Sequence, residues 1–419
     1  MHTSHSIKHS LITAVLCFVS ATLFGQETID TMFYNLLEYP SASPANRRQI
    51  LQNILVDYSP DIFMVCELES NEGSNDILDF SLNGNVNSYS AAPFVINQSG
   101  DGELQQNLFY RSSRFSLIEQ NIITTTVRDI NHYVLRLLTE EADTNPIELH
   151  IFVAHLKSSD GGANEAIRFE MITEFVDFLD TLPADSKVLF AGDFNMYDAD
   201  EDGYIELLDA TNSIVLKDPI DTPGAWNNNE DFTAIHTQST RVSSGGFGAG
   251  AGGGLDDRFD FILLSENMLS TPSLQYVDDT YKSYGNNGNC YNLDINDPSC
   301  TGIYSQTTRS RLYNTSDHLP VVLTLQTDQT FILGNEQFEV LDAWTLESTL
   351  VSNEITFSFT SEILENHTIV ISNILGQRVS EKKITTNMTQ NIDVSAFPSG
   401  LYFINAKNTN LPRLQFLKR

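Results

Sequence analysis

The chain has 419 residues, enough for two domains, and its 41% hydrophobic content with 25 Phe can fill a large core, so the composition excludes a disordered protein. The formal net charge is −32, and nearly all of the acidic excess lies before Phe331. Because proteins that hold nucleic acid tightly usually present a basic face, this balance counts against processive nucleic-acid binding. It leaves open a hydrolase that works with divalent cations, which screen the repulsion between an acidic protein and a polyanion.

Residues 1–25 are predicted to be a secretory signal peptide. Lys8 precedes an apolar run from Leu11 to Phe24, and the small residue Gly25 stands at a plausible cleavage point. The run is shorter than the roughly 18 residues that a transmembrane helix needs, and no later apolar run reaches that length. We therefore expect an exported protein with no transmembrane segment.

Helical and strand patterns alternate after this segment. In order, we expect a helix over 47–58, a strand over 61–66, a strand over 150–157, a helix over 163–182 and a strand over 187–195. The last three form a strand–helix–strand unit. If its strands are parallel, their ends meet at one edge of the sheet, which would make His155 and Asp193 neighbours although 38 residues separate them.

Short polar signatures stand where apolar runs stop. They are FYNLLE with Asn35, MVCELE with Glu67, VAHLKSS with His155, AGDFN with Asp193 and Asn195, RFDFILLS with Asp260, and TSDHLP with Asp317 and His318. Strand ends that face the same way would gather these side chains into one acidic, histidine-bearing pocket. Such a pocket suits metal-assisted attack of water on a phosphate ester. Any one of these residues alone would more often be a turn or strand-end residue.

The order and wording of these signatures, from Thr28 to Leu325, resemble the endonuclease/exonuclease/phosphatase family, which includes deoxyribonuclease I, exonuclease III and the inositol-phosphate 5-phosphatases. The resemblance implies an α/β fold, a four-layer α/β/β/α sandwich of the deoxyribonuclease I type. It also implies a catalytic domain over 26–328, followed by a linker over 329–337.

The same resemblance implies a role for each catalytic residue. His318 would act as general base or acid, Asp260 would hold its imidazole in the needed tautomer, and His155 would be a second imidazole on the phosphate. Asp193 would deprotonate or position the attacking water, and Asn195 would donate to the phosphoryl oxygen.

The implied cofactor is Mg²⁺ or Mn²⁺. Asn35, Glu67 and Asp317 would hold it, because hard divalent cations take oxygen ligands. Arg309 and Arg311 precede the TSDHLP signature and could clamp a distal phosphate, although solvated loop arginines are equally common.

An acidic segment shortly after Asn195, DADEDGYIELLD, fits the D-x-D-x-D-G pattern of a calcium loop. The candidate ligands of a structural Ca²⁺ are Asp198, Asp200, Asp202, the Tyr204 carbonyl, Glu206 and Asp209. Asp209 stands where the longer Glu is usual. The alternative is an acidic loop that caps a helix beginning at Tyr204.

Glycine and cysteine give two further expectations. The stretch SSGGFGAGAGGGLDD contains G-x-G-x-x-G from Gly248 to Gly253, without the flanking strand and helix that a dinucleotide site needs, so we interpret it as a flexible surface loop. Cys66 lies in an apolar strand and is expected to be a buried free thiol. Cys290 and Cys300 flank a polar loop and could form a small disulfide in an oxidising compartment.

Residues 338–419 contain short alternating runs separated by turn residues, as in a small antiparallel β-sandwich. The stretch NIDVSAFPSGLYF and the basic terminus resemble the C-terminal sorting domain of the type IX secretion system of Bacteroidota, with Phe397 where Leu is usual. The resemblance implies passage through the periplasm, contact with the type IX secretion machinery, and a secreted or cell-surface location. A carbohydrate-binding or adhesion module is the alternative.

Three functions stay open. The leading one is a secreted, divalent-metal-dependent phosphodiester hydrolase, a nuclease that cleaves extracellular DNA or RNA. The second is a phosphatase or phosphodiesterase of small phosphoesters or phospholipid headgroups, for which the acidic surface leaves room. The third is a non-catalytic, calcium-dependent surface binding module, which would tolerate loss of pocket residues that this chain carries.

Overall fold

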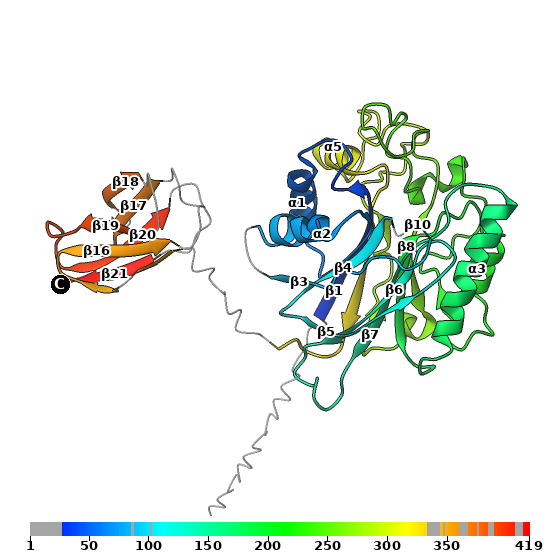
Figure 1. The fold of residues 1–419 in the computed structure, drawn as a ribbon, viewed down its shortest axis with the longest axis horizontal. Helices are drawn as coiled ribbons and strands as arrows, with labels where there is room; N and C mark the ends of the chain where they lie inside the picture. The colour runs from blue at the N-terminus through cyan, green and yellow to red at the C-terminus, as the bar shows by residue number, and fades with distance from the viewer. Residues whose placement is uncertain are drawn as a thin grey trace, which may run out of the picture.

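The computed structural model describes residues 27–84, 88–100, 103–332, 344–346, 348–359, 368–374, 377–383, 389–406 and 414–419. The predicted signal peptide and residues 333–337 of the predicted linker lie outside them. The described strands fall into an N-terminal region, residues 27–332, and a C-terminal region, residues 344–419, and each region has its own sheets (Figure 1).

The N-terminal region contains two β-sheets. In sheet order, the first holds β11 (Gln275–Tyr276), β13 (Val321–Thr327), β1 (Glu27–Tyr39), β2 (Ile62–Leu68), β4 (Gln105–Arg111) and β3 (Tyr89–Ala91), with β12 (Lys282–Ser283) also paired to β13. The second holds β5 (Phe115–Ile123), β6 (Ile130–Leu137), β7 (Glu148–His155), β8 (Lys187–Asp193), β10 (Asp260–Ser265) and β9 (Leu216–Lys217). The pairs β1–β2 and β7–β8 are parallel, and the other described pairs of these sheets are antiparallel.

The inner faces of the two sheets share one apolar core. Ile29, Phe33 and Met64 of the first sheet belong to the same buried cluster as Ile151 and Leu189 of the second. Since side chains alternate between the two faces of a strand, every second residue of these strands points toward this shared core.

Helices cover the two outer faces (Figure 1). On the first sheet lie α1 (Arg47–Tyr58), α2 (Asn71–Asp76), the π-helical turn η1 (Ile77–Leu82) and α5 (Gln306–Thr315), on the second lie α3 (Gly162–Leu179) and α4 (Asp202–Leu207), and two 3₁₀ turns are η2 (Glu230–Ile235) and η3 (Glu266–Leu269). Leu51 of α1 shares a buried cluster with Phe63 of β2. Phe175 of α3 stacks on Phe190 of β8, with ring centroids 4.0 Å apart. The predicted four-layer α/β/β/α sandwich is therefore confirmed.

Both predicted helices are present, and α3 begins at Gly162, one residue before the predicted start. The helix predicted over 47–58 is α1, with the same bounds. The helix predicted to reach Leu182 ends at Leu179 instead. The N–H groups of Thr181 and Leu182 donate to carbonyls three residues back, which tightens the last turn ahead of Pro183.

The strand registers bring the ends of three strands together. In the parallel pair β7–β8, His155 lies opposite Asp193, as the strand–helix–strand pattern predicts. In the antiparallel pair β8–β10, Asp260 lies opposite Asp193 from the other side. The second sheet thus places an imidazole and two carboxylates side by side at one edge.

The C-terminal region has two small sheets with a core of their own. One is β14 (Trp344–Leu346), β16 (Glu354–Phe359) and β19 (Thr389–Asp393), and the other is β15 (Leu350–Val351), β21 (Leu414–Lys418), β20 (Gly400–Ala406), β17 (Thr368–Asn373) and β18 (Arg378–Lys383). Ile355 and Phe357 of the first pack in one buried cluster with Ile371, Ile404 and Phe416 of the second. The predicted small β-sandwich is confirmed, and the domain boundaries stay predictions.

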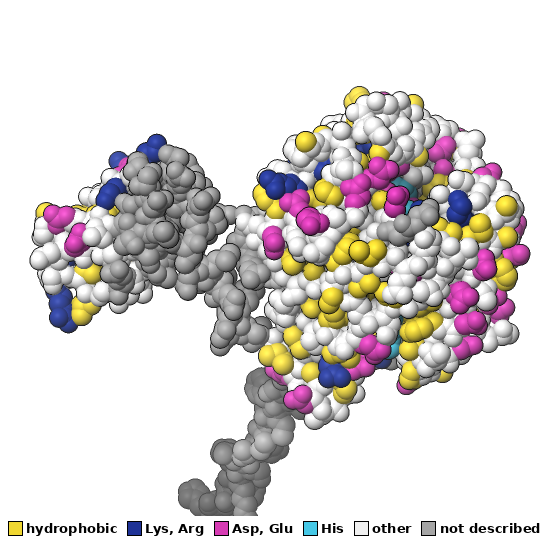
Figure 2. All heavy atoms as spheres, in the orientation of Figure 1, with side chains coloured by type: hydrophobic (Ala, Val, Ile, Leu, Met, Phe, Trp, Pro, Cys, Tyr) yellow, Lys and Arg dark blue, Asp and Glu magenta, His cyan; other side chains and the backbone are white. Residues whose placement is uncertain are grey.

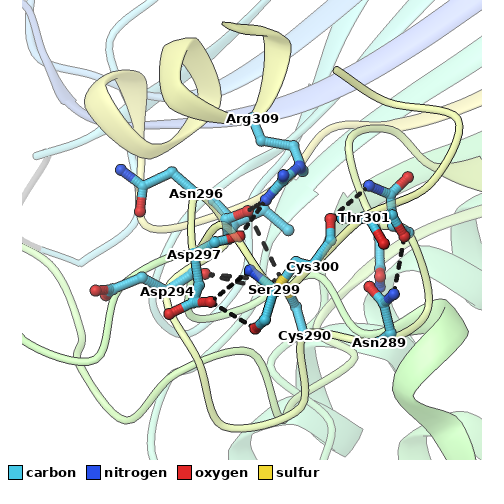
Figure 3. The surroundings of a disulfide bond; sticks show 12 residues. Asn289, Cys290, Asp294, Asn296, Asp297, Ser299, Cys300, Thr301 and Arg309 are labelled. Atoms are coloured by element: carbon cyan, nitrogen blue, oxygen red, sulfur yellow. Dashed lines mark hydrogen bonds between the residues drawn. A yellow bond between two sulfur atoms is a disulfide. The ribbon is translucent and has the colours of Figure 1, made fainter. Parts of the chain in front are cut away.

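Both cysteine expectations agree with the structure. Cys290 and Cys300 form a disulfide that closes a polar loop (Figure 3). The Arg309 side chain donates to the carbonyls of Ile295 and Asp297 within this loop, at 2.7 and 2.8 Å. Cys66 is buried and free. Among the helices in the described part of the chain, none combines the length and the apolarity needed to cross a bilayer.

Candidate active site

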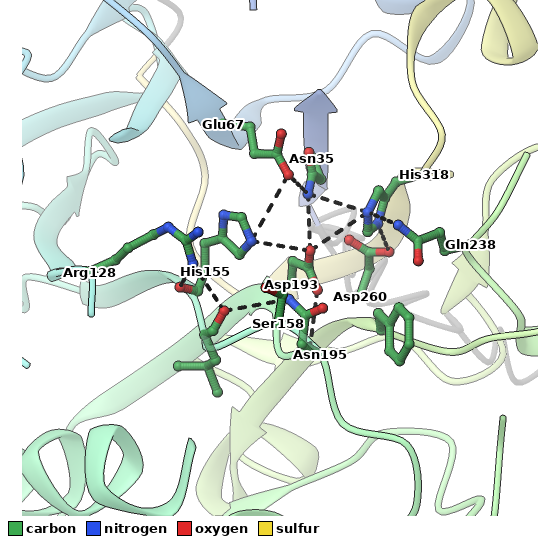
Figure 4. Close-up of polar contacts among 12 residues, drawn as sticks. Asn35, Glu67, Arg128, His155, Ser158, Asp193, Asn195, Gln238, Asp260 and His318 are labelled. Atoms are coloured by element: carbon green, nitrogen blue, oxygen red, sulfur yellow. Dashed lines mark hydrogen bonds and ion pairs between the residues drawn. The ribbon is translucent and has the colours of Figure 1, made fainter. Parts of the chain in front are cut away.

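The strand ends of both sheets converge on one group of polar side chains, which we call the strand-end cluster (Figure 4). Its members are Asn35 on β1, Glu67 on β2, His155 at the end of β7, Asp193 at the end of β8, Asp260 at the start of β10, and His318 shortly before β13. All but Glu67 are buried, and the Glu67 side chain is 12% exposed. Six residues predicted from separate signatures therefore lie together.

One half of the cluster gathers around Asn35. The Asn35 side-chain amide donates to Glu67 Oε1 at 2.8 Å and to Asp193 Oδ2 at 3.0 Å. His155 Nε2 lies 3.6 Å from Asp193 Oδ2 and 4.0 Å from Glu67 Oε1. The side-chain oxygen of Asn35, Oδ1, accepts the Leu37 N–H at 3.0 Å, so the side-chain amide nitrogen is the atom that faces the cluster.

The other half is an imidazole between two carboxylates. His318 Nδ1 lies 2.7 Å from Asp260 Oδ2, and His318 Nε2 lies 3.7 Å from Asp193 Oδ2. A carboxylate on Nδ1 favours the tautomer whose proton sits on that nitrogen, so Nε2 keeps its lone pair for a proton of water or substrate.

Burial and neighbouring charges shift the pKa values of the cluster. Burial lowers the pKa of His155 well below its usual value. Burial raises the pKa of Glu67, and the Asp317 charge adds to this. Burial, Asp260 and Glu67 raise the pKa of Asp193 to about 7, against the opposing effect of His318. Burial opposes the proton on His318, but Asp260, Asp193 and Asp317 raise the pKa of His318 well above its usual value.

Burial acts on all four groups, and the raised pKa values of Glu67, Asp193 and His318 also reflect neighbouring carboxylates, an excess of buried negative charge that a divalent cation would relieve. Among the described residues, Glu67, His155 and Asp193 form one group whose ligand atoms lie within 4.8 Å of one another, and Asp193, Asp260 and His318 form another. The first group fits a resident metal better, because Asp260 and His318 already bind each other. Its two carboxylates supply the oxygen ligands that Mg²⁺ and Mn²⁺ prefer.

Asn195 follows Asp193 in a left-handed turn, with φ of 53°, a conformation that Asn tolerates. Its backbone N–H donates to Asp193 Oδ1 at 3.1 Å, and its side-chain amide lies 3.5 Å from the Leu156 carbonyl. The turn therefore holds the Asp193 carboxylate and keeps the Asn195 side chain beside the cluster (Figure 4).

Asp317 lies behind His318, and the glycine-rich stretch contacts it. Asp317 Oδ2 accepts the Ala251 N–H at 2.7 Å. Gly250 has φ of +86°, and a Cβ there would lie 2.9 Å from Asp317 Cγ, so only glycine fits. The sequence predicted a metal ligand at Asp317 and a flexible surface loop around Gly250. In the structure Asp317 belongs to neither metal-competent group, and the loop packs against it.

Two side chains beside the cluster were missed by sequence reasoning. Gln238 Nε2 lies 2.6 Å from His318 Nε2, and Arg128 Nη1 donates to the carbonyls of Leu156 and His155 at 3.2 and 3.4 Å. Neither stands in a recognisable signature. Only the tertiary fold brings their loops to the strand ends.

The two candidate phosphate arginines have other partners. Arg309 is buried and donates to the disulfide loop, as described above, and to Gln306 Oε1 at 2.7 Å. Arg311 pairs with Asp57 of α1. The contacts that the structure gives these side chains lie outside the strand-end cluster.

The acidic segment after Asn195 forms a turn and a short helix. Asp198 Oδ1 accepts the Asp200 N–H at 2.9 Å, and α4 begins at Asp202, two residues before the predicted Tyr204. Asp209 Oδ1 accepts the Thr211 N–H at 2.7 Å. The remaining two candidates, Tyr204 and Glu206, lie within α4, where the residues wind around a helix axis rather than around a common point.

Arg168 of α3 forms a buried ion pair beside the strand-end cluster. Its guanidinium binds Glu201 through two nitrogens, at 2.7 and 2.9 Å, and both side chains are buried. A further nitrogen donates to the carbonyls of Lys157 and Ser159, each at 3.0 Å. The pair ties the loop after His155 to α3 and α4, and so fixes one wall of the cluster.

Comparisons with known proteins give one family match and a set of similar structures. Residues 351–415 match the model of the secretion system C-terminal sorting domain. No curated protein matches the chain. The predicted sorting domain and the predicted secreted or cell-surface location are therefore confirmed.

Three similar solved structures each cover 72% of this chain. A TDP2 from D. rerio, in complex with a single-stranded DNA product, is 19% identical over 99% of its own length, with a TM-score of 0.47. The human Nocturnin catalytic domain with bound sulfate is 16% identical over 97% of its length, with a TM-score of 0.44. An endonuclease/exonuclease/phosphatase family protein from Bacteroides thetaiotaomicron is 18% identical over 96% of its length, with a TM-score of 0.43.

Proposed function

We propose that this protein is a secreted, divalent-metal-dependent phosphodiester hydrolase. One observation carries the proposal: His318, paired to Asp260 at 2.7 Å, directs its second nitrogen at the same Asp193 carboxylate that the Glu67–His155 group shares. A general acid or base and a metal-competent group thus meet at one carboxylate. This arrangement suits water attack on a phosphate ester.

In this proposal each side chain has a task, and Asp193 has two. Asp193 accepts or orients the proton of the attacking water, and Asp260 holds His318 so that Nε2 can exchange a proton with the substrate. Asn35 keeps the Glu67 and Asp193 carboxylates in place through its amide. A bound Mg²⁺ or Mn²⁺, held by Glu67, His155 and Asp193, would stabilise the negative charge that develops on the phosphate.

Asn195 and the secretion route complete the proposal. In this proposal the Asn195 amide donates to a phosphoryl oxygen, where negative charge develops during the reaction. An exported enzyme meets nucleic acid outside the cell, so the leading substrate is extracellular DNA or RNA.

The surface charge supports a second candidate substrate class. Figure 2 shows acidic side chains gathered beside a histidine on the face in view, with Lys and Arg side chains scattered. With a net charge of −32, the protein repels a long polyanion at low salt. A small phosphodiester or a phospholipid headgroup would suffer less repulsion than DNA.

Hydrolysis assays separate these candidates. The protein is incubated with plasmid DNA and with bis-p-nitrophenyl phosphate, each with Mg²⁺ and with EDTA, at several salt concentrations. Metal-dependent nicking that strengthens with salt screening supports a nuclease. Cleavage of the small diester alone supports the second class. Inactivity on both substrates with Mg²⁺ and with Mn²⁺ would favour the non-catalytic binding module.

A further inference from the structure

Gln238 contacts the proposed general acid or base directly. Its amide nitrogen lies 2.6 Å from His318 Nε2, the nitrogen on the side away from Asp260. In Figure 4 it reaches this nitrogen from the side opposite His155. The side chain therefore lies beside any oxygen that would contact His318 Nε2.

The backbone of Gln238 is held on both sides. Its N–H donates to the Asp257 carbonyl at 3.0 Å, and its carbonyl accepts the N–H groups of Asp256 and Asp257 at 2.9 and 2.8 Å. Substitutions of the side chain leave these bonds intact, because they are made by main-chain atoms alone. The side chain is thus presented to the cluster from a fixed point.

Asp317 sets the orientation of the Gln238 amide. Asp317 Oδ2 accepts from Gln238 Nε2 at 3.2 Å and from the Ala251 N–H at 2.7 Å. With the amide reversed, the Gln238 oxygen would face this carboxylate and repel it. The amide nitrogen, which only donates, is therefore the atom turned toward His318.

This geometry aims two hydrogen-bond donors at one place. The lone pair of His318 Nε2 is faced by the Gln238 amide at 2.6 Å and by the Asn35 amide at 3.4 Å. An anionic oxygen that comes into hydrogen-bond reach of His318 Nε2 enters beside the Gln238 N–H. It then accepts from the Gln238 amide, and from His318 when Nε2 carries a proton, as an oxygen with several lone pairs can.

We propose that Gln238 is a substrate-binding residue, whose amide donates to a non-bridging oxygen of the scissile phosphate, and that Asp317 is the positioning residue for this amide. The inference rests on the proposed phosphodiester hydrolysis and adds a residue to it. The chemical group recognised is a phosphoryl oxygen, whatever the rest of the substrate.

Gln238→Met tests the proposal, because Met has a similar length and cannot donate. We expect kcat/KM for bis-p-nitrophenyl phosphate to fall about 10- to 100-fold, since the lost donor faces developing charge. We also expect inorganic phosphate to bind about tenfold more weakly in Mg²⁺, measured by titration calorimetry. Gln238→Glu places a carboxylate against both Asp317 and the phosphate. We expect it to lower kcat/KM and phosphate affinity more than Gln238→Met does.

Gln120→Met is the matched control. Gln120 on β5 donates to the Pro93 carbonyl at 2.9 Å, and its loss should leave both readouts within about twofold of the wild type. Thermal melts check that each variant is folded. If Gln238→Met does not fold, Gln238→Asn gives the same comparison, because it keeps the amide and draws it back by one methylene.

The outcomes separate the two proposals. Wild-type kinetics and wild-type phosphate affinity in folded Gln238→Met would overturn the role of Gln238 while leaving the hydrolase in place. A wild type that cleaves no phosphodiester would end the proposed function, and phosphate affinity would then decide on Gln238 alone. In that case, the role of Gln238 would be overturned by equal phosphate affinity in the wild type and Gln238→Met. It would also be overturned if the wild type bound no phosphate.

Discussion

Two buried histidine sites in the N-terminal region differ in what surrounds the imidazole. His318 binds Asp260 and faces Asp193, whereas His132 stacks on His150 and Phe152 in the second sheet. Carboxylates raise the pKa of His318 well above its usual value despite burial. Burial, with a smaller contribution from His150, lowers the pKa of His132 to about 3. Burial thus fixes an imidazole, and its charged neighbours decide whether it can exchange protons.

Removing the imidazole from each site should give the largest contrast. His318→Ala should lower kcat for bis-p-nitrophenyl phosphate by about 10³-fold, the size of a typical general acid–base contribution. His132→Phe removes an equally buried imidazole and should keep kcat within about twofold. Circular dichroism would show that both variants are folded. Retained turnover in His318→Ala would remove the proposed mechanism.

The same contrast can be drawn between a buried and an exposed carboxylate. Glu67→Gln keeps the side-chain shape and removes a charge from the Glu67–His155–Asp193 group. The Mg²⁺ concentration for half-maximal rate should rise at least about tenfold, because hard cations bind charged oxygen most tightly. Asp200→Asn, in the exposed turn after Asn195, should leave it unchanged. Equal Mg²⁺ dependence in both variants would place the metal elsewhere.

The stack around His132 should show itself in acid stability. Because the folded pKa of about 3 lies below the unfolded value near 6.5, the unfolded chain binds more protons below pH 6.5. Stability from this residue is complete above that pH and is lost as pH falls toward 3. At pH 5 the loss is about 2 kcal/mol.

His132→Phe isolates this contribution, since Phe can still stack on Phe152 and carries no proton. Urea unfolding at pH 7 and pH 5 should show a smaller loss of unfolding free energy in the variant than in the wild type. Some loss remains, because burial also lowers the pKa of His150. Identical losses in the two proteins would mean that His132 is solvated in the folded state.

The sequence predicts the parts of the molecule that follow from local pattern. Apolar periodicity identified α1. The strand–helix–strand pattern placed His155 opposite Asp193, because the ends of two parallel strands lie at the same edge of the sheet. The polar signatures then selected which strand ends carry chemistry. Each of these steps depends on residues that are close in sequence or on one strand pairing.

Contacts between loops could not be predicted in this way. Gln238 contacts His318 although 80 positions separate them in the sequence, and Ala251 contacts Asp317 although 66 positions separate them. Arg309 stands in a polar sequence that reads as solvated, yet the disulfide loop buries its guanidinium. Sequence periodicity does not predict these contacts, because the path of each loop depends on how the whole sandwich packs.

Of these predictions, a substitution in the acidic turn after Asn195 should have the smallest effect. A calcium loop needs its carboxylates to converge, but Asp198 is occupied by the Asp200 N–H, and α4 already begins at Asp202. We therefore expect EDTA to lower the melting temperature of the wild type and of Asp198→Ala equally, because any metal at the strand-end cluster is lost from both. A larger fall in the wild type would establish a structural Ca²⁺.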